Sequence, residues 1–222
     1  MLVLAITASM TVSCQRAEAD TFKPESFDFT LRTPTDEMGF EAGYTYFVHD
    51  DGSVLISTAD VSGDVVIPST LGGKNVTAIG EGAFFKNTSI TSVVIPDTVE
   101  TIGIYAFSDC ASLTSVSVGS KVWRIAPFAF DNTPWLSSLT DEFVTVGDGV
   151  LIAYNGSSRT PVLPDSIRHL GGAFAGKTDI CAITLGKGVL TISDMAFSFC
   201  ANLTDIDLGL SLVYAGDQAF SG

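Results

Sequence analysis

The sequence predicts a solenoid, a fold in which short coils of the chain stack along one axis. Two observations lead to this prediction: the dipeptide Ala-Phe recurs at 23-residue steps in two groups of three, and aliphatic residues keep a fixed distance from each Phe. The repeated aromatic residues are Phe84, Phe107, Phe130, Phe174, Phe197 and Phe220. We therefore expect a β-rich fold of 23-residue repeats with short helical turns.

Each repeat contains the elements of one coil. Leu113, Val116 and Val118 alternate with polar residues, which predicts a short strand whose apolar side chains point inward. The Ala-Phe segment is expected to form a tight turn or a single helical turn on the opposite wall, with Phe at the centre of the coil. Because so short a coil cannot bury both of its walls alone, neighbouring coils must stack to share one core.

The repeated positions form a recognisable pattern. One copy holds Val76, Ile79, Gly80, Ala83, Phe84, Ile90, Val93, Ile95 and Pro96. The next holds Val99, Ile102, Gly103, Ala106, Phe107, Cys110, Leu113 and Val116. These residues resemble the leucine-rich repeats of bacterial BspA-like (treponemal-type) surface proteins, over about residues 44–222. The resemblance implies a leucine-rich-repeat solenoid and, less specifically, an exported adhesin.

Residues 1–14 are expected to be an export signal. Met1 to Ser13 is uncharged and mostly apolar, and it is shorter than the roughly 20 residues that span a bilayer. Thr11 to Cys14 resembles a bacterial lipobox, which implies a lipid anchor on Cys14, although Thr11 stands where Leu is usual and a basic n-region is missing. An ordinary cleaved signal and a buried strand are the alternatives. Residues 15–40 are polar and contain prolines, which predicts a flexible linker.

Two hairpins are expected around the repeats. Tyr44–Val48 and Val54–Ser57 flank an Asp-Gly turn, which predicts a hairpin cap within residues 41–72. The repeats then occupy residues 73–222. Within them, residues 140–161 hold two strand-like runs around a Gly-Asp-Gly turn, and we expect an inserted hairpin there.

The composition argues against several functions. There are 25 acidic and 11 basic residues, a net charge of −14, so the chain repels phosphate backbones and anionic lipids. We therefore expect no nucleic-acid partner, and membrane contact only through the N-terminal anchor.

Catalytic and metal chemistry is also not expected. The only histidines are His49 and His169, both predicted to be at the surface, and no G-x-S-x-G elbow or phosphate loop is present. Asp205 and Asp207 could form a glycosidase-like pair or a weak calcium site, but a solvated strand explains them better. No close Cys/His cluster exists, so we expect no metal and no cofactor.

The cysteines do not predict disulfides. Cys110 and Cys200 share one repeat position but lie about three coils apart, roughly 15 Å, whereas a disulfide needs Cα atoms within about 7 Å. Both are expected to pack as small buried thiols. Cys181 belongs to a strand and should face outward.

The outward positions of the strands are the candidate ligand-binding face. Their side chains are small and mostly hydroxylated, so they lose little entropy on docking and can hydrogen-bond an extended partner. The candidate residues are Thr91, Ser92, Thr114, Ser115, Ser117, Thr184, Thr204, Asp205 and Asp207. The alternative is that Thr and Ser merely suit exposed strands.

The sequence thus favours a non-catalytic protein, exported to a bacterial cell surface and either lipid-anchored or secreted. Its partners would be extracellular proteins, host matrix or other cells, as the resemblance implies. The alternative is a structural spacer or envelope module of a longer protein, with no ligand of its own.

Overall fold

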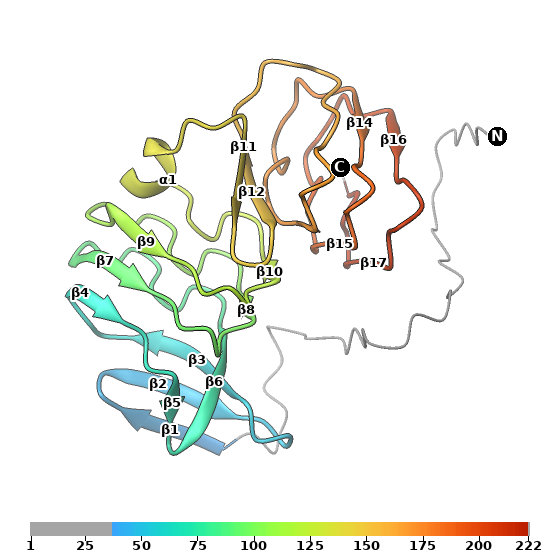
Figure 1. The fold of residues 1–222 in the computed structure, drawn as a ribbon. Coiled ribbons are helices and arrows are strands. Elements are labelled where there is room, and N and C mark those ends of the chain that lie inside the picture. The colour runs from blue at the N-terminus through green and yellow to red at the C-terminus, as the bar shows by residue number, and fades with distance from the viewer. Residues whose placement is uncertain (1–36, 222) are drawn as a thin grey trace.

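The protein winds into stacked coils with little helix, as the computed structural model shows for residues 37–221 (Figure 1). The predicted repeat solenoid is therefore confirmed. The predictions for the export signal at residues 1–14, for Cys14 and for residues 15–36 of the linker lie outside the described residues.

The first half of the chain, residues 37–139, has a large sheet on one wall and a parallel ladder on another. The sheet has the order β1-β2-β3-β6-β8-β10, with β5 paired to β6. Its strands are β1 (Glu37–Glu41), β2 (Tyr44–Val48), β3 (Val54–Ala59), β5 (Thr70–Leu71), β6 (Lys74–Ile79), β8 (Thr101–Ile102) and β10 (Arg124–Ile125). The first ladder comprises β4 (Gly63–Val66), β7 (Ile90–Val94) and β9 (Ser115–Ser117).

The second half, residues 140–221, repeats this plan after the short helix α1 (Pro134–Ser138). Its sheet contains β11 (Phe143–Val146), β12 (Val150–Tyr154), β13 (His169–Leu170), β15 (Thr191–Ile192) and β17 (Tyr214–Ala215). The second ladder comprises β14 (Ala182–Thr184) and β16 (Asp205–Asp207).

The two halves are internal copies of one another. In each, an antiparallel hairpin (β2–β3 or β11–β12) continues into parallel strands, through β3–β6 or β12–β13. The run Asp-Gly-Ser-Val-Leu-Ile at 51–56 corresponds to Asp-Gly-Val-Leu-Ile at 148–152. The hairpin expected at 140–161 is therefore not an insertion within one array, because its strand β12 opens the second array.

One boundary of the sequence analysis is wrong. Residues 37–40, assigned to the linker, belong to β1, which pairs along its whole length with β2. The polar residues that precede this segment hid the strand, and β1 lies at the sheet edge, where its Met38 and Phe40 side chains are exposed.

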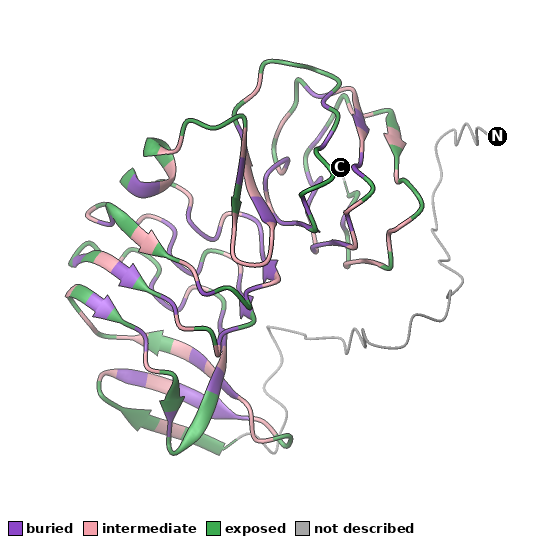
Figure 2. Cartoon of the chain, viewed as in Figure 1, coloured by how far each residue is buried: buried purple, intermediate pink, exposed green. Residues whose placement is uncertain are grey.

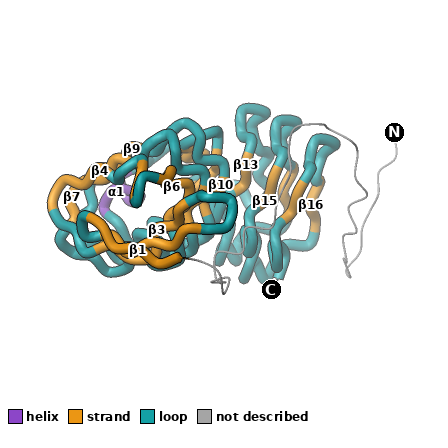
Figure 3. Tube along the Cα trace, turned by 90° about the horizontal axis from the view of Figure 1, so that it is seen from below, coloured by secondary structure: helices purple, strands orange, loops and turns teal. Residues whose placement is uncertain are grey.

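The direction of stacking changes between the halves. In Figure 1 the coils of the first half are stacked from bottom to top, whereas those of the second half are stacked from left to right. Figure 3, turned by 90°, shows the coils of β13, β15 and β16 side by side while the first half is seen more nearly end-on. The structure is thus an angular solenoid with a junction near β10 and β12.

Stacked phenylalanine rings form the core of each half, and buried residues line the inside of both (Figure 2). Ring centroids are 4.6 Å apart between Phe84 and Phe107, and 5.1 Å apart between Phe107 and Phe130. Tyr44 meets the first stack edge-on at 6.4 Å, and Tyr154 lies 5.3 Å from the first ring of the second stack. Each fully buried ring contributes about 1.5–3 kcal/mol.

The Ala-Phe segments form hydrogen-bonded turns rather than helical turns. Four of the turns place left-handed residues on either side of Ala-Phe, such as Tyr105 (φ 55°) and Asp109 (φ 59°). The turns are bonded to one another along the solenoid, for example from the Phe107 N–H to the Ala129 carbonyl at 2.7 Å. Backbone hydrogen bonds therefore connect successive coils along this wall as well.

Helix α1 replaces a ladder strand in the third coil. The Thr133 side chain caps it by accepting the Leu136 N–H at 3.2 Å, and Pro134 occupies the first turn, where no N–H is needed. Trp135 is buried, and its ring meets Phe130 edge-on at 4.8 Å. The tryptophan thus closes the first phenylalanine stack.

Candidate functional site

The first ladder presents a row of small polar side chains. Strand register places Ser92 opposite Ser115 and Val94 opposite Ser117. Asp64, one strand earlier, accepts hydrogen bonds from the Ser92 hydroxyl at 2.6 Å and the Thr91 hydroxyl at 2.9 Å. Both hydrogen bonds lower the pKa of the Asp64 carboxyl group, and the bond from Ser92 has the larger effect. The carboxylate therefore stays ionised on this exposed face.

Two exposed valines, absent from the sequence-based list of site residues, interrupt this polar row. Val66 is 70% exposed and Val94 is 42% exposed, and the two are directly paired between β4 and β7. Their outward position could be derived from the alternation of the strands. The first ladder is therefore an amphipathic face that offers hydroxyl groups, one carboxylate and a small apolar patch.

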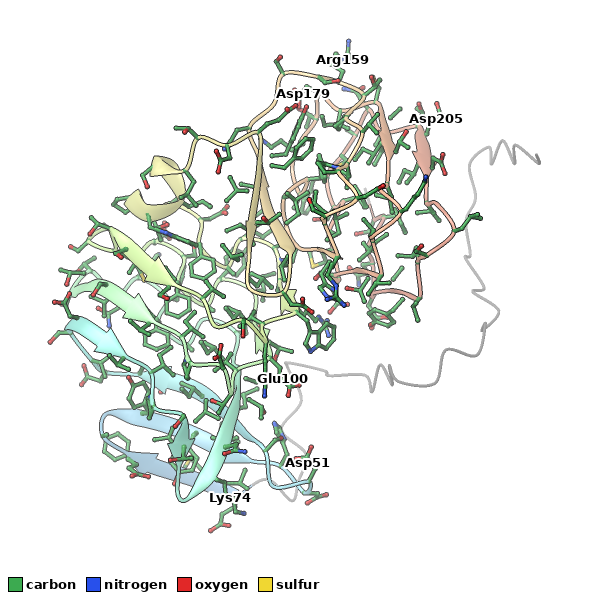
Figure 4. All side chains as sticks on the ribbon, viewed as in Figure 1. Asp51, Lys74, Glu100, Arg159, Asp179 and Asp205 are labelled. Atoms are coloured by element: carbon green, nitrogen blue, oxygen red, sulfur yellow. The ribbon has the colours of Figure 1, made fainter. Side chains whose placement is uncertain are left out.

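The second ladder is more acidic. Asp205 pairs with Ala182, and Asp207 pairs with Thr184. Both aspartates are exposed. Beside them, the Thr204 hydroxyl donates to the Cys181 carbonyl of the preceding coil at 3.2 Å. Figure 4 shows Arg159, Asp179 and Asp205 at the same end of this half.

The nine predicted face residues fall into two groups rather than on one continuous face. Thr91, Ser92, Thr114, Ser115 and Ser117 lie on or beside the first ladder, whereas Thr184, Thr204, Asp205 and Asp207 lie on or beside the second. Helix α1 and the change in stacking direction separate the groups. The missing ladder strand in the third coil explains the difference from the sequence-based prediction.

A buried column links successive coils through side-chain donors. The Cys110 thiol donates to the Phe84 carbonyl of the preceding coil at 3.1 Å, whereas Thr133, at the equivalent position, donates within its own coil to the Phe130 carbonyl at 2.8 Å. Cys200 repeats the arrangement toward the Phe174 carbonyl at 3.0 Å. Cys110 and Cys200 are buried free thiols, as predicted, and they also hydrogen-bond the preceding coil.

The junction holds the strongest concentration of buried polar groups. The guanidinium of Arg124, on β10, pairs with the carboxylate of Asp194 in the second half. Nearby, His169 Nδ1 lies 2.8 Å from the Thr191 hydroxyl, and Nε2 lies 3.5 Å from an Asp148 carboxylate oxygen. Burial lowers the pKa of His169 while Asp148 opposes this shift.

The prediction that His169 lies at the surface is wrong, because its side chain is only 4% exposed. Its column holds Thr101 and Thr191 in other coils, and both are also buried. The bend between the halves encloses this column, which the repeat pattern alone does not reveal. We interpret the cluster as a structural joint, since the Arg124–Asp194 pair connects the two halves directly.

Two features are not found in residues 37–221. Within this range no three His, Cys, Asp or Glu residues gather as metal ligands. None of its helices has the length and apolar character needed to cross a bilayer.

Comparison with known proteins identifies the repeats. A family model for the BspA-type leucine-rich repeat region matches in six copies, at residues 69–150 and 152–222. The chain belongs to this family. BspA-type repeats therefore account for the Phe stacks, the ladders and the left-handed turns alike. Among curated proteins, none matches this chain.

Solved structures of leucine-rich repeat proteins resemble the chain. A leucine-rich repeat protein of Treponema pallidum is 24% identical, with a TM-score of 0.50, over 81% of this chain and 86% of that one. A leucine-rich cell surface protein of Faecalibacterium prausnitzii is 23% identical, with a TM-score of 0.45, over 83% of this chain and 52% of that one. The Treponema likeness supports the repeat fold.

Proposed function

We propose that this protein is an exported, non-catalytic repeat protein that binds macromolecules at a bacterial cell surface through its ladders. The observation that carries the proposal is the first ladder, where Ser92 lies opposite Ser115 and Ser117 continues the outward row of β9. Such side chains lose little entropy on docking and can bond an extended partner. Extracellular proteins, host matrix or other cells are the proposed partners, and lipidation of Cys14 is the proposed anchor.

Binding of the full chain to immobilised matrix proteins and glycans tests the proposal. The variant Ser115→Arg, Ser117→Arg should abolish saturable binding if the first ladder is used. Thr184→Arg, Asp207→Arg tests the second ladder in the same way. Ser157→Arg, at an exposed residue outside both ladders, is the matched control and should bind as wild type does.

If the folded protein binds none of these molecules, the ladder proposal is wrong and the spacer alternative is favoured. The anchor has a separate test. Radiolabelled palmitate should be incorporated into the chain in a bacterial host and lost in Cys14→Ser, and an unlabelled wild-type chain would exclude the anchor in that host.

A further inference from the structure

Three aromatic side chains form a strip on the turn wall of the first half. This aromatic strip consists of Phe85, Tyr105 and Phe128, from three successive coils. The centroids of Phe85 and Tyr105 are 6.2 Å apart, and those of Tyr105 and Phe128 are 5.5 Å apart with nearly parallel rings. Phe85 is 45% exposed and Tyr105 is 41% exposed. The positions equivalent to Tyr105 in the second half hold Gly172, Met195 and Gln218, so the strip is confined to the first half.

Local stability does not explain the strip. Tyr105 and Phe128 have φ values of 55° and 62°, in the left-handed region that costs a bulky residue roughly 1–2 kcal/mol. Gly82 occupies the same position in the first coil without that cost. Glycine or asparagine would suit the turn better than a half-exposed ring. The equivalent Met195 and Gln218 have the same left-handed backbone, so this conformation belongs to the repeat, and the aromatic side chains are what is particular to the first half.

The strip ends at a hollow beside the junction. Phe128 lines this hollow together with Ile125, Phe130, Leu136 and Ile152, and the carboxylate-bearing Asp131 completes its wall. The hollow lies where the second half begins with a hairpin in place of an Ala-Phe turn. Most of its lining residues are apolar, but the part of the wall that is open to solvent is mainly polar.

The two ends of the strip carry opposite charge. At the first end, the Lys86 ammonium lies 4.8 Å from the centre of the Phe85 ring. At the other end, burial raises the pKa of Asp131, and the charge of neighbouring Asp109 raises it further. The two residues lie side by side on successive coils, where the Asp109 N–H donates to the Asp131 carbonyl at 2.9 Å and Asn132 Nδ2 donates to Asp109 Oδ1 at 2.8 Å, so a cation placed there would be attracted to both carboxylates.

We propose that the aromatic strip docks a segment of a partner protein that carries an apolar side chain next to a lysine or arginine. The apolar side chain packs on the exposed rings of Phe85 and Tyr105 beside Phe128, and the cation pairs with Asp131 and Asp109. A second copy of this chain is a poor occupant, because each copy carries a net charge of −14. This site lies on a different wall from the ladders, so the test of this site is independent of the test of the ladders.

Selection of 12-residue peptides from a phage-displayed library on the full chain tests the site. Enriched peptides should share an apolar residue beside Lys or Arg. Their affinity, measured with synthetic peptides, should fall at least tenfold for Tyr105→Asn and for Asp131→Asn. Replacing the basic residue of the peptide by Glu should cause a similar loss. The ladder variant Ser115→Arg, Ser117→Arg should bind these peptides as wild type does.

Thermal unfolding separates docking from a structural role. Asn tolerates the left-handed backbone, and Asp131→Asn removes a poorly compensated carboxylate, so both variants should keep the wild-type melting temperature within about 3 °C. The proposal would be overturned if no peptides with an apolar residue beside Lys or Arg are selected. It would also be overturned if the selected peptides bind both variants with the wild-type affinity. Self-association of the chain that Tyr105→Asn abolishes would equally overturn it, because the occupant would then be a second copy.

Discussion

Cys110 and Thr133 occupy the same repeat position, and each donates to the carbonyl of a stacked phenylalanine. Cys110 donates to Phe84 of the preceding coil, whereas Thr133 donates to Phe130 of its own coil. A buried carbonyl at this point needs a donor, and thiol and hydroxyl are both small enough to supply it. The sequence analysis detected the small buried side chain but not the hydrogen bond, because apolar packing alone already explained a cysteine.

A matched pair of substitutions measures this bond. Cys110→Thr keeps a donor at the position, whereas Cys110→Val has nearly the same shape without one. We expect the valine variant to be less stable than the threonine variant by about 1 kcal/mol, the usual net value of a buried hydrogen bond. Urea unfolding of both proteins gives the difference. Equal stability of the two variants would mean that the thiol contributes by packing alone.

The same burial protects the thiol from alkylation. It raises the pKa of Cys110 from 9.0 to about 11, so at pH 8 the reactive thiolate is scarce as well as inaccessible. In the folded protein, iodoacetamide should label the half-exposed Cys181 well before Cys110, as peptide mass mapping would show. Unfolding in guanidinium should remove the difference. Rapid labelling of Cys110 in the native protein would contradict the burial described here.

His169 should make stability depend on pH. Burial lowers its folded-state pKa, so the fold favours neutral imidazole, with Asp148 opposing and Arg168 reinforcing the shift. As the pH falls through about 6.5, His169 takes up a proton in the unfolded chain before it does so in the folded protein. The free energy of unfolding is therefore highest above that pH and decreases below it. His169→Asn should flatten this decline in urea titrations between pH 7 and pH 5. If the slope of stability against pH is the same in this variant as in the wild type, other titratable groups cause the decline.

At the scale of elements, the stacked rings should dominate the energetics. Phe107 is fully buried between two neighbouring rings, so Phe107→Ala leaves a cavity and should cost about 3–5 kcal/mol. Phe199, which is 61% exposed, serves as the control, and Phe199→Ala should change stability by less than about 0.5 kcal/mol. Chemical denaturation gives the free energy of unfolding of both variants. If both variants lose similar amounts of stability, the phenylalanine stack is not the principal core.

The elements that follow the repeat period were predictable, and those that depart from it were not. The ladder strands, the Phe column and both hairpins follow from periodicity and from Asp-Gly turns. Helix α1 has a cap signal in Thr133 and Pro134, but the repeat pattern suggested a strand there. The left-handed turns escaped prediction because Tyr105 and Phe128 are residues that normally avoid such backbone.

At the scale of the whole molecule, contacts between distant residues determine how the halves meet. Arg124 and Asp194 are 70 positions apart, and nothing in either coil indicates that they pair. The Ser193 hydroxyl likewise donates to the Ile125 carbonyl across the same bend, at 3.4 Å. Two arrays of similar sequence therefore form one angular body. The bend also divides the predicted binding face into two ladders with different charge.

The Arg124–Asp194 pair should hold that angle. The Arg124 side chain is 5% exposed and that of Asp194 is 33% exposed, so Asp194→Asn weakens the pairing of a buried cation and should cost about 2–3 kcal/mol. The double variant Arg124→Thr, Asp194→Ser, which removes both charges and installs the threonine found in neighbouring coils, should recover most of this loss. Arg168→Gln, which breaks an exposed ion pair, should cost less than about 1 kcal/mol. Small-angle scattering should show a larger radius of gyration for Asp194→Asn alone. If stability and radius both match wild type in that variant, packing between the halves rather than the ion pair maintains the bend.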